Sequence, residues 1–183
     1  MPRLYRIYED LIDPKLCDQI EMVIFGFQFP WNFHANTNYS TGETQPDDVP
    51  QFTHGFYRDD QIASQVMGIP MEIIKPFGLE LKDLYRAKAN MVGWEKSPKT
   101  HPPHTDDDFD HYVILYYVND SDGDTELYIP GEEIVRITPK KGRTLVFDGK
   151  LKHASASPVE TRYRAAININ VKAHVPRAQV GLD

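Results

Sequence analysis

The sequence has 183 residues, of which 40% are hydrophobic and 11% aromatic. A chain of this length and composition can bury one packed core, so we expect a single domain and exclude disorder of the whole chain. The net charge of −7 and the lack of any Lys/Arg run argue against nucleic acid as a partner. No stretch of about 18 apolar residues predicts a membrane span, and the N-terminal MPRLYRIYED lacks the apolar segment of a secretory signal. We therefore expect an intracellular, cytoplasmic protein with no membrane partner.

The cysteine content limits the kinds of metal site that the chain can build. Cys17 is the only cysteine, which excludes an internal disulfide framework and a thiolate metal cluster. Any metal must therefore be bound by His, Asp or Glu side chains.

The first predicted element in chain order is a helix near the N-terminus. Asp13 can cap the free N–H groups of a helix, and Pro14 suits its first turn. Apolar residues follow at helical spacing, and we expect this side of the helix to lie on the core. These residues are Leu16, Ile20, Val23, Ile24 and Phe27.

A long loop and two short helices are predicted next. Residues 31–50, WNFHANTNYSTGETQPDDVP, have no sustained periodicity and many turn-forming residues. Long loops within compact domains are often functional, so we expect the part from Trp31 to Val49 to order or close over a site when substrate arrives. Between Asp59 and Gly78, apolar groups are interrupted by glycine and proline, which favours two short helices.

The C-terminal half is predicted to be predominantly β. Six strand-like stretches are separated by Pro, Gly and Asp turns: Leu84–Val92, His111–Val118, Glu126–Ile129, Ile134–Ile137, Thr144–Phe147 and Tyr163–Lys172. Helices followed by many short strands predict a mainly β, α+β protein, in which helices buttress a β-sandwich or jelly roll. We expect residues 1–82 to supply helical support and the loop, and residues 83–175 to supply the β core.

One histidine pattern predicts a metal site. Of the 7 histidines, only His104 is followed two positions later by a carboxylate, that of Asp106. Residues two apart in an extended chain point to one side, so both can reach a single ion. His153 is the natural third member, because it follows a predicted strand and a turn at Gly149 and would complete a two-His-one-carboxylate site. The alternative is a surface histidine beside a solvated acidic run.

The last predicted strand has one apolar and one polar face. In RAAININV, Ala165, Ile167, Ile169 and Val171 alternate with Arg164, Ala166, Asn168 and Asn170. If the polar face points into a jelly roll, Arg164 can form a bidentate bond to a dicarboxylate that also chelates the metal. The alternative is an edge strand with its polar face in water.

Several motifs in the same order along the chain carry a family resemblance. They are YEDLIDPKLCDQI, RAKAN, HTD, YYVNDSDGDTEL, PKKGRTLVF and HASASPVETRYRAAININ. Together they cover most of the chain and resemble the prolyl-hydroxylase-like branch of the 2-oxoglutarate/Fe(II) oxygenases, especially small phage and marine bacterial members. The resemblance implies a double-stranded β-helix, or jelly roll, that binds Fe(II) and 2-oxoglutarate.

The resemblance also implies roles for individual residues. The family's H-x-D motif and distal histidine match His104, Asp106 and His153, which would bind the iron. An arginine on the following strand normally holds the far carboxylate of 2-oxoglutarate. Arg164 matches it best, and Arg162 has the same strand parity and stays an alternative.

Two further residues match positions that contact the cosubstrate in relatives. Tyr117 matches a tyrosine whose phenol contacts the far carboxylate, although a core aromatic residue would explain it equally well. Asn90 matches a polar contact. The chain departs from the family where Gly123-Asp124 replaces a common Gly-Gly pair, and where Trp94 and several prolines precede the H-x-D motif.

The implied activity is a dioxygenase reaction that consumes 2-oxoglutarate and O₂ and releases succinate and CO₂. We expect hydroxylation of an amino-acid side chain or a peptide. An oxygenase for a small metabolite or a modified nucleobase, and a non-catalytic metal-binding jelly roll, are the alternatives. The remaining histidines should be dispensable for iron: His34, His54, His101, His111 and His174.

Overall fold

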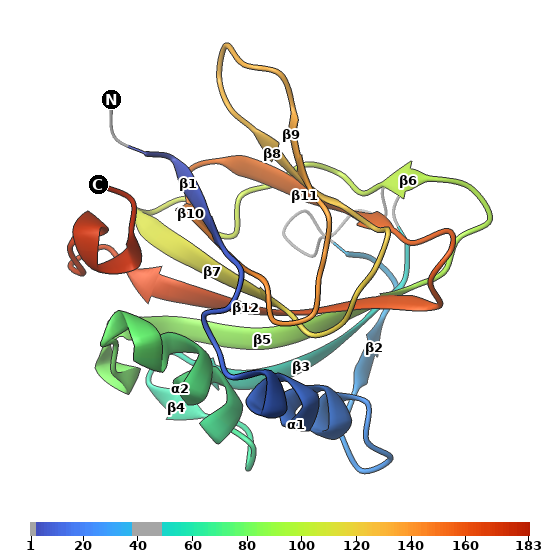
Figure 1. Ribbon diagram of the computed structural model, residues 1–183, viewed down its shortest axis with the longest axis horizontal. Coiled ribbons are helices and arrows are strands. Elements are labelled where there is room, and N and C mark those ends of the chain that lie inside the picture. Colours follow the sequence, from blue (N-terminus) through green and yellow to red (C-terminus); the bar gives the residue numbers. More distant parts are fainter. Residues whose placement is uncertain (1–2, 38–48) are drawn as a thin grey trace.

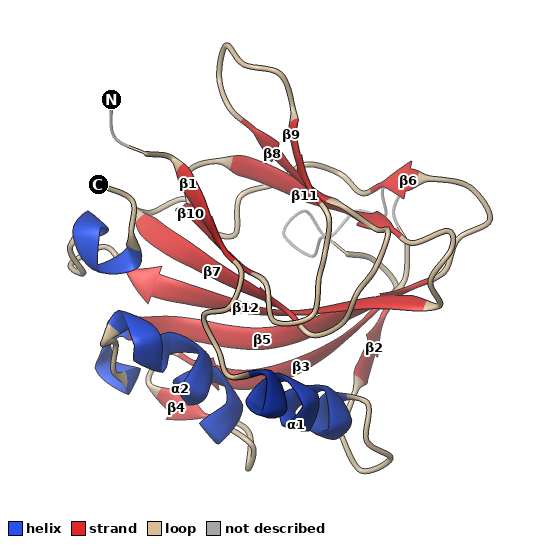
Figure 2. Cartoon of the chain, in the orientation of Figure 1, coloured by secondary structure: helices blue, strands red, loops and turns tan. Residues whose placement is uncertain are grey.

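The computed structural model describes residues 3–37 and 49–183, and within them two antiparallel sheets form a jelly roll (Figures 1 and 2). The larger sheet has the strand order β1-β10-β7-β12-β5-β3-β2, and β4 pairs with β3. Its strands are β1 (Tyr5–Tyr8), β2 (Asn32–His34), β3 (Gln51–Arg58), β4 (Gln61–Ile62), β5 (Leu84–Gly93), β7 (His111–Tyr117), β10 (Thr144–Asp148) and β12 (Tyr163–Lys172). The smaller sheet, in the order β6-β11-β8-β9, contains β6 (Lys99–Thr100), β8 (Thr125–Tyr128), β9 (Val135–Ile137) and β11 (Lys152–Ser157).

Helices cover the outer face of the larger sheet (Figure 1). They are α1 (Pro14–Ile24) and α2 (Gly68–Ile74), with short 3₁₀ turns at Lys75–Phe77, Leu81–Asp83 and Arg177–Val180. The predicted start of α1 is confirmed, because the Asp13 carboxylate accepts a hydrogen bond from the backbone N–H of Lys15 at 2.9 Å. Within the described residues, no helix combines the length and the apolar character that crossing a bilayer requires.

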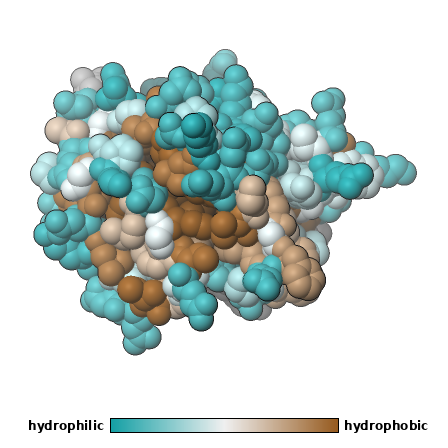
Figure 3. Space-filling view, turned by 60° about the horizontal axis from the view of Figure 1, so that its bottom comes forward, coloured by the Kyte–Doolittle hydropathy of each residue, from teal (hydrophilic) through white to brown (hydrophobic). Residues whose placement is uncertain are grey.

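The predicted core-facing side of α1 is only partly correct. Ile20 and Ile24 are buried, but α1 ends at Ile24, so Phe27 lies beyond it and is fully exposed. Val23 and Met22 are also exposed, at 39% and 74%. Apolar residues therefore remain at the surface on the helix-covered side, which Figure 3 turns toward the viewer.

The central strands of the larger sheet divide their side chains between two cores. On β7, Tyr112, Ile114 and Tyr116 pack toward the helices, whereas Val113, Leu115 and Tyr117 pack between the two sheets. On β12, the four alternating apolar residues Ala165, Ile167, Ile169 and Val171 face the helices. The opposite face of β12, which begins at Arg164, therefore points between the two sheets.

The edge-strand alternative for β12 is wrong. This strand lies between β7 and β5 in the middle of the larger sheet, and Arg164, Asn168 and Asn170 are 5%, 5% and 0% exposed. Its polar side chains are thus enclosed, which is costly unless they have partners or a ligand.

The structure differs from the sequence prediction in the first 82 residues. The region expected to be helices and loop also supplies β1, β2, β3 and β4 to the larger sheet. β2 lies inside the stretch predicted as a loop, and it pairs with β3. Of the expected lid from Trp31 to Val49, residues 38–48 lie outside the described part of the chain.

Candidate metal centre

Backbone pairing brings the two predicted histidine ligands together. The segment that contains β6 runs antiparallel to β11, and a β-bridge then joins His104 to His153. The N–H of each donates to the carbonyl of the other, at 3.0 and 2.9 Å. Because directly opposed residues on antiparallel chains share a face, the two imidazoles lie side by side, with ring centroids 4.8 Å apart.

Hydrogen bonds fix which ring nitrogen of each histidine is free. Nδ1 of His104 lies 3.2 Å from the carbonyl of Pro102, and Nδ1 of His153 lies 3.1 Å from that of Leu151. A carbonyl can only accept, so Nδ1 carries the proton and the Nε2 lone pair is free to bind a metal. Burial lowers the pKa of His153 to about 4, so its imidazole is neutral at pH 7.

The Asp106 carboxylate is held by two amide donors and one cation on the inner face of the larger sheet. Oδ2 accepts hydrogen bonds from the side-chain amides of Asn168 and Asn170, both at 2.8 Å. Oδ1 lies 2.7 Å from Nη2 of Arg86 in an ion pair. Burial opposes ionisation, but the positive charges of Arg86 and Lys88 and the amide of Asn170 hold the pKa of Asp106 well below its usual range.

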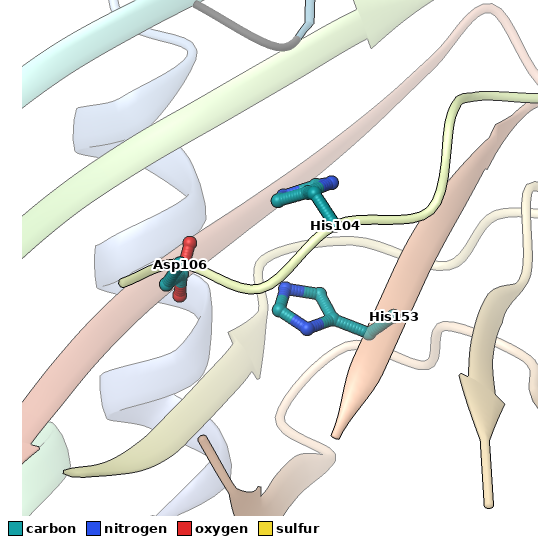
Figure 4. A group of neighbouring side chains, drawn as sticks. All are labelled: His104, Asp106 and His153. Atoms are coloured by element: carbon teal, nitrogen blue, oxygen red, sulfur yellow. The ribbon is translucent and has the colours of Figure 1, made fainter. Parts of the chain in front are cut away.

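His104, Asp106 and His153 can offer three ligand atoms that lie within 4.8 Å of one another. His153 extends from β11 toward the segment that carries His104 and Asp106 (Figure 4). The two amides use the acceptor capacity of Oδ2, whereas Oδ1 keeps a lone pair for a cation. Two imidazoles and one carboxylate fit a facial site for Fe(II).

The other histidines lie outside this cluster, among the residues that the structure describes. His101 is nearest in sequence, but its Nδ1 and Nε2 lie 2.8 and 2.9 Å from the hydroxyls of Ser155 and Ser157. Both ring nitrogens of His101 are therefore occupied within the small sheet.

The predicted arginine lies in a second polar cluster on the same inner face. Nε of Arg164 donates to the carbonyl of Gly123 at 2.8 Å, and Nη2 donates to Oγ1 of Thr125 at 2.7 Å. Tyr117 also donates its hydroxyl to Oγ1 of Thr125, at 2.7 Å. Arg162, the alternative, precedes β12 and is exposed beside a different surface hollow.

Thr125 has one proton left to donate. A hydroxyl can accept two hydrogen bonds and donate one, and both acceptor positions of Thr125 are used by Tyr117 and Arg164. Because Thr125 and Arg164 line the same pocket, the cluster presents a hydroxyl donor beside a guanidinium. Tyr117 is fully buried behind Thr125, so its phenol acts on the pocket through that hydroxyl.

Glycine is required where the carbonyl of residue 123 meets Arg164. A Cβ at Gly123 would overlap the carbonyl oxygen of Ala156 and would lie 3.2 Å from Cδ of Arg164. Asp122 anchors this turn by accepting hydrogen bonds from the backbone N–H groups of Val159, Glu160 and Thr161 at 2.8–3.0 Å. The turn thus holds the Gly123 carbonyl against the guanidinium.

One pocket connects the three-residue cluster with Arg164. It is lined by His104, Asp106 and His153 at one end and by Thr125 and Arg164 at the other. Asn90 also lines it, and its buried Oδ1 has no hydrogen-bond partner in the described part of the chain.

Lys88 is a second cation on the wall of this pocket. Burial lowers its pKa to about 8, so the amine still carries its charge at pH 7. Sequence reasoning missed Lys88, and it also missed Arg86 and Thr125. The alternation KAN in RAKAN places Lys88 and Asn90 on one face, but only strand pairing shows that this face meets the metal-binding cluster.

Comparison with solved structures identifies the architecture. A prolyl hydroxylase from Trichoplax adhaerens, in complex with a hypoxia inducible factor peptide fragment, aligns over 94% of this chain and 84% of its own, with a TM-score of 0.68 and 12% identity. An oxidoreductase of the 2OG-Fe(II) oxygenase family from Burkholderia pseudomallei aligns over 91% and 84%, with a TM-score of 0.68 and 11% identity. The chain has the fold of the 2-oxoglutarate/Fe(II) oxygenases.

The same oxygenase fold occurs in a prolyl-4-hydroxylase from Pseudomonas putida, which aligns over 93% of this chain and 92% of its own, with a TM-score of 0.57 and 12% identity. No protein-family model and no curated protein sequence matches the chain. The similarity confirms the expected jelly-roll fold.

Proposed function

We propose that this protein is a 2-oxoglutarate- and Fe(II)-dependent dioxygenase. The observation that carries the proposal is the convergence of His104, Asp106 and His153, with both imidazole Nε2 atoms free, inside an oxygenase fold. The nearby Arg164 provides a buried cation for a dicarboxylate in the same pocket.

The residues of the chain would hold the metal in a fixed geometry. His104 and His153 each present Nε2, and the bonds from their Nδ1 atoms to backbone carbonyls keep both rings oriented. Asn168 and Asn170 keep the Asp106 carboxylate turned toward the two histidines. Bound Fe(II), together with 2-oxoglutarate and O₂, supplies the oxidising chemistry, with succinate and CO₂ as the coproducts.

Arg164 and Thr125 would hold the distal carboxylate of 2-oxoglutarate. The guanidinium already has Nε and Nη2 bonded to the protein, which fixes its orientation and leaves Nη1 for a ligand. Thr125 adds its hydroxyl proton, and Tyr117 keeps that hydroxyl in place. Charge-assisted bonds of this kind bind a carboxylate strongly in a water-poor pocket.

The substrate class proposed from the sequence is an amino-acid side chain or a peptide. Support comes from the two prolyl hydroxylases among the similar structures, one of which is in complex with a peptide fragment. This part of the proposal rests on analogy, because one fold can host many substrates.

Succinate formation tests the proposed activity. The purified protein, incubated with amino-acid and peptide substrates, should form succinate only when Fe(II), 2-oxoglutarate and O₂ are all present. His153→Ala should abolish the activity, whereas His101→Ala should retain it, because both ring nitrogens of His101 lie within hydrogen-bond distance of the Ser155 and Ser157 hydroxyls. Metal binding without any binding of 2-oxoglutarate would instead favour the non-catalytic metal-binding jelly roll.

A further inference from the structure

Lys88 is a cation in the pocket that has no role in the proposed binding of Fe(II) or of 2-oxoglutarate. Its side chain lines the pocket together with His104, Asp106 and His153. Within the described part of the chain it makes no ion pair or hydrogen bond, whereas Arg86 is paired with Asp106 and Arg164 is bonded to Gly123 and Thr125. Lys88 is partly buried, and a partly buried charge without a partner is unfavourable, so we expect an anionic group of a ligand to pair with it.

The charges of the pocket leave room for one more anion. Among the ionisable residues that line it, Lys88 and Arg164 are cationic, Asp106 is anionic and the two histidines are neutral when they bind a metal. Fe(II) and 2-oxoglutarate together add no net charge. Arg86, which pairs with Asp106, adds a third positive charge, so the site keeps an excess of two positive charges, one of which lies on Lys88.

Strand register separates Lys88 from the cosubstrate arginine. On β12, Arg164 pairs with Val92 of β5, whereas Lys88 pairs with Asn168, four residues further along. At about 3.4 Å per residue, the two levels are roughly 14 Å apart. Asn168 donates to Asp106, so Lys88 lies at the metal end of the pocket and Arg164 lies at the other end.

Open space lies beside Lys88 on its other side. Its partner on β3 is Gly55, and a Cβ built on Gly55 would meet no atom of residues 3–37 or 49–183 within 4 Å. Lys88 lines the pocket next to the metal-binding residues, and the space at Gly55 lies beside it on the neighbouring strand. This position is suited to the substrate rather than to 2-oxoglutarate.

From this geometry we infer that Lys88 binds a carboxylate of the primary substrate, so that the site takes a small carboxylic acid, such as a free amino acid. The inference rests on the proposed function and narrows it. An internal peptide segment brings no main-chain carboxylate to the amine. A phosphate group would bring nearly two negative charges to a single cation, which fits the pocket less well.

The test uses free L-amino acids, each compared with its own carboxamide. Binding is measured by calorimetry on the protein loaded with Mn(II) and 2-oxoglutarate without O₂. At least one free acid should bind, and its carboxamide should bind about tenfold more weakly, or worse. Lys88→Met should lower the affinity for the acid to that for the amide, because Met keeps the length of the side chain without its charge.

Two further variants control the experiment. Lys15→Met removes the same charge from the exposed face of α1 and should change nothing. Gly55→Val fills the space beside Lys88 and should weaken the acid about tenfold even though the lysine is intact. In both Lys88→Met and Gly55→Val, the affinity for 2-oxoglutarate should stay within about threefold of the wild-type value.

The outcomes separate this inference from the proposed function. If the wild-type protein does not bind 2-oxoglutarate in a metal-dependent manner, the proposed function fails. If it does, the inference alone is overturned by any of three results. In the first, no free acid binds better than its carboxamide. In the second, Lys88→Met still prefers the acid to the carboxamide. In the third, Lys88→Met no longer binds 2-oxoglutarate.

Discussion

The two faces of β12 differ in what they do for the protein. The outer face carries Ala165, Ile167, Ile169 and Val171, which are fully buried against the helical layer. The inner face carries Arg164, Ala166, Asn168 and Asn170, and three of these residues make the polar contacts that build the pocket. Along this strand, residues that stabilise the core therefore alternate with residues that line the pocket.

This division explains how the protein can enclose so many polar groups. The apolar side chains of the outer face stabilise the fold by burial alone, whereas each polar side chain of the inner face needs a hydrogen bond to offset its desolvation. Asn170 donates to Asp106 and accepts from Arg86, and Arg164 is bonded to Gly123 and Thr125. Asn168 donates to Asp106, but its buried Oδ1 has no hydrogen-bond partner among the described residues. Substitutions on the two faces should consequently have separable effects.

The largest effect on stability should come from the outer face. Ile167→Ala leaves a cavity at a fully buried position and should lower the free energy of unfolding by about 4 kcal/mol. Urea denaturation measures this loss, and Mn(II) affinity below the unfolding transition should be unchanged. A variant that keeps its stability but binds Mn(II) weakly would contradict the division between the two faces.

On the inner face, Arg164→Ala should act on the cosubstrate. Loss of the guanidinium leaves the distal carboxylate without its cation and should weaken 2-oxoglutarate binding by about 3 kcal/mol. Lys at this position keeps the charge but not the two fixed bonds, so it should recover only part of the affinity. Calorimetry with Mn(II) in the absence of O₂ provides the measurement, and Arg162→Ala is the matched control. Weaker 2-oxoglutarate binding in Arg162→Ala but not in Arg164→Ala would show that Arg162, and not Arg164, holds the distal carboxylate.

A smaller effect is expected at Asp122, which supports the inner face from the turn before β8. Although burial opposes ionisation, hydrogen bonds from the backbone N–H groups of Thr161 and Val159 hold the pKa of Asp122 below its usual range. Asp122→Asn should lower the free energy of unfolding by about 2 kcal/mol at pH 7.

The pH dependence of this difference follows from the lowered pKa. The stability contributed by Asp122 is present above the unfolded-state pKa of about 3.9 and is lost as the pH falls through the folded-state value. The gap between wild type and Asp122→Asn should therefore narrow only in strong acid. A gap that is the same at pH 7 and at pH 2 would show that the ionised carboxylate is not the cause.

Tyr117→Phe should produce the smallest effect. It removes one hydrogen bond to Thr125 but leaves Arg164 and its bond to Thr125 in place. Binding of 2-oxoglutarate should weaken by about 1 kcal/mol, roughly fivefold. A loss as large as that of Arg164→Ala would mean that the phenol contacts the ligand directly.

The sequence predicted the strands that have strong local patterns. Tyr163–Lys172 was predicted with its observed bounds, because branched apolar residues alternate along it. β11, KHASAS, was missed, since small and polar residues form a strand there only through pairing with β8 and β6. β3 was missed for a similar reason, because its polar residues and Gly55 give no clear alternation.

The residues of the candidate site could likewise be predicted only where local sequence patterns reveal them. H-x-D and the inward arginine could be predicted, because each depends on spacing within a short segment. Arg86, Lys88 and Thr125 could not, because their place in the site depends on how β5 and β8 pair with distant strands. The proposed ligand role of His153 required the family order of motifs, although in the structure one β-bridge brings it opposite His104.

The central claim is that the inner face holds Fe(II) through His104, Asp106 and His153. The most direct test is calorimetric titration of Mn(II) into the wild-type protein, His153→Ala and His101→Ala. His101 lies on the same segment as His104, but both of its ring nitrogens are bonded to serines. His153→Ala should weaken Mn(II) binding on the order of 100-fold or more, whereas His101→Ala should bind like the wild type. Wild-type affinity in His153→Ala would contradict the account.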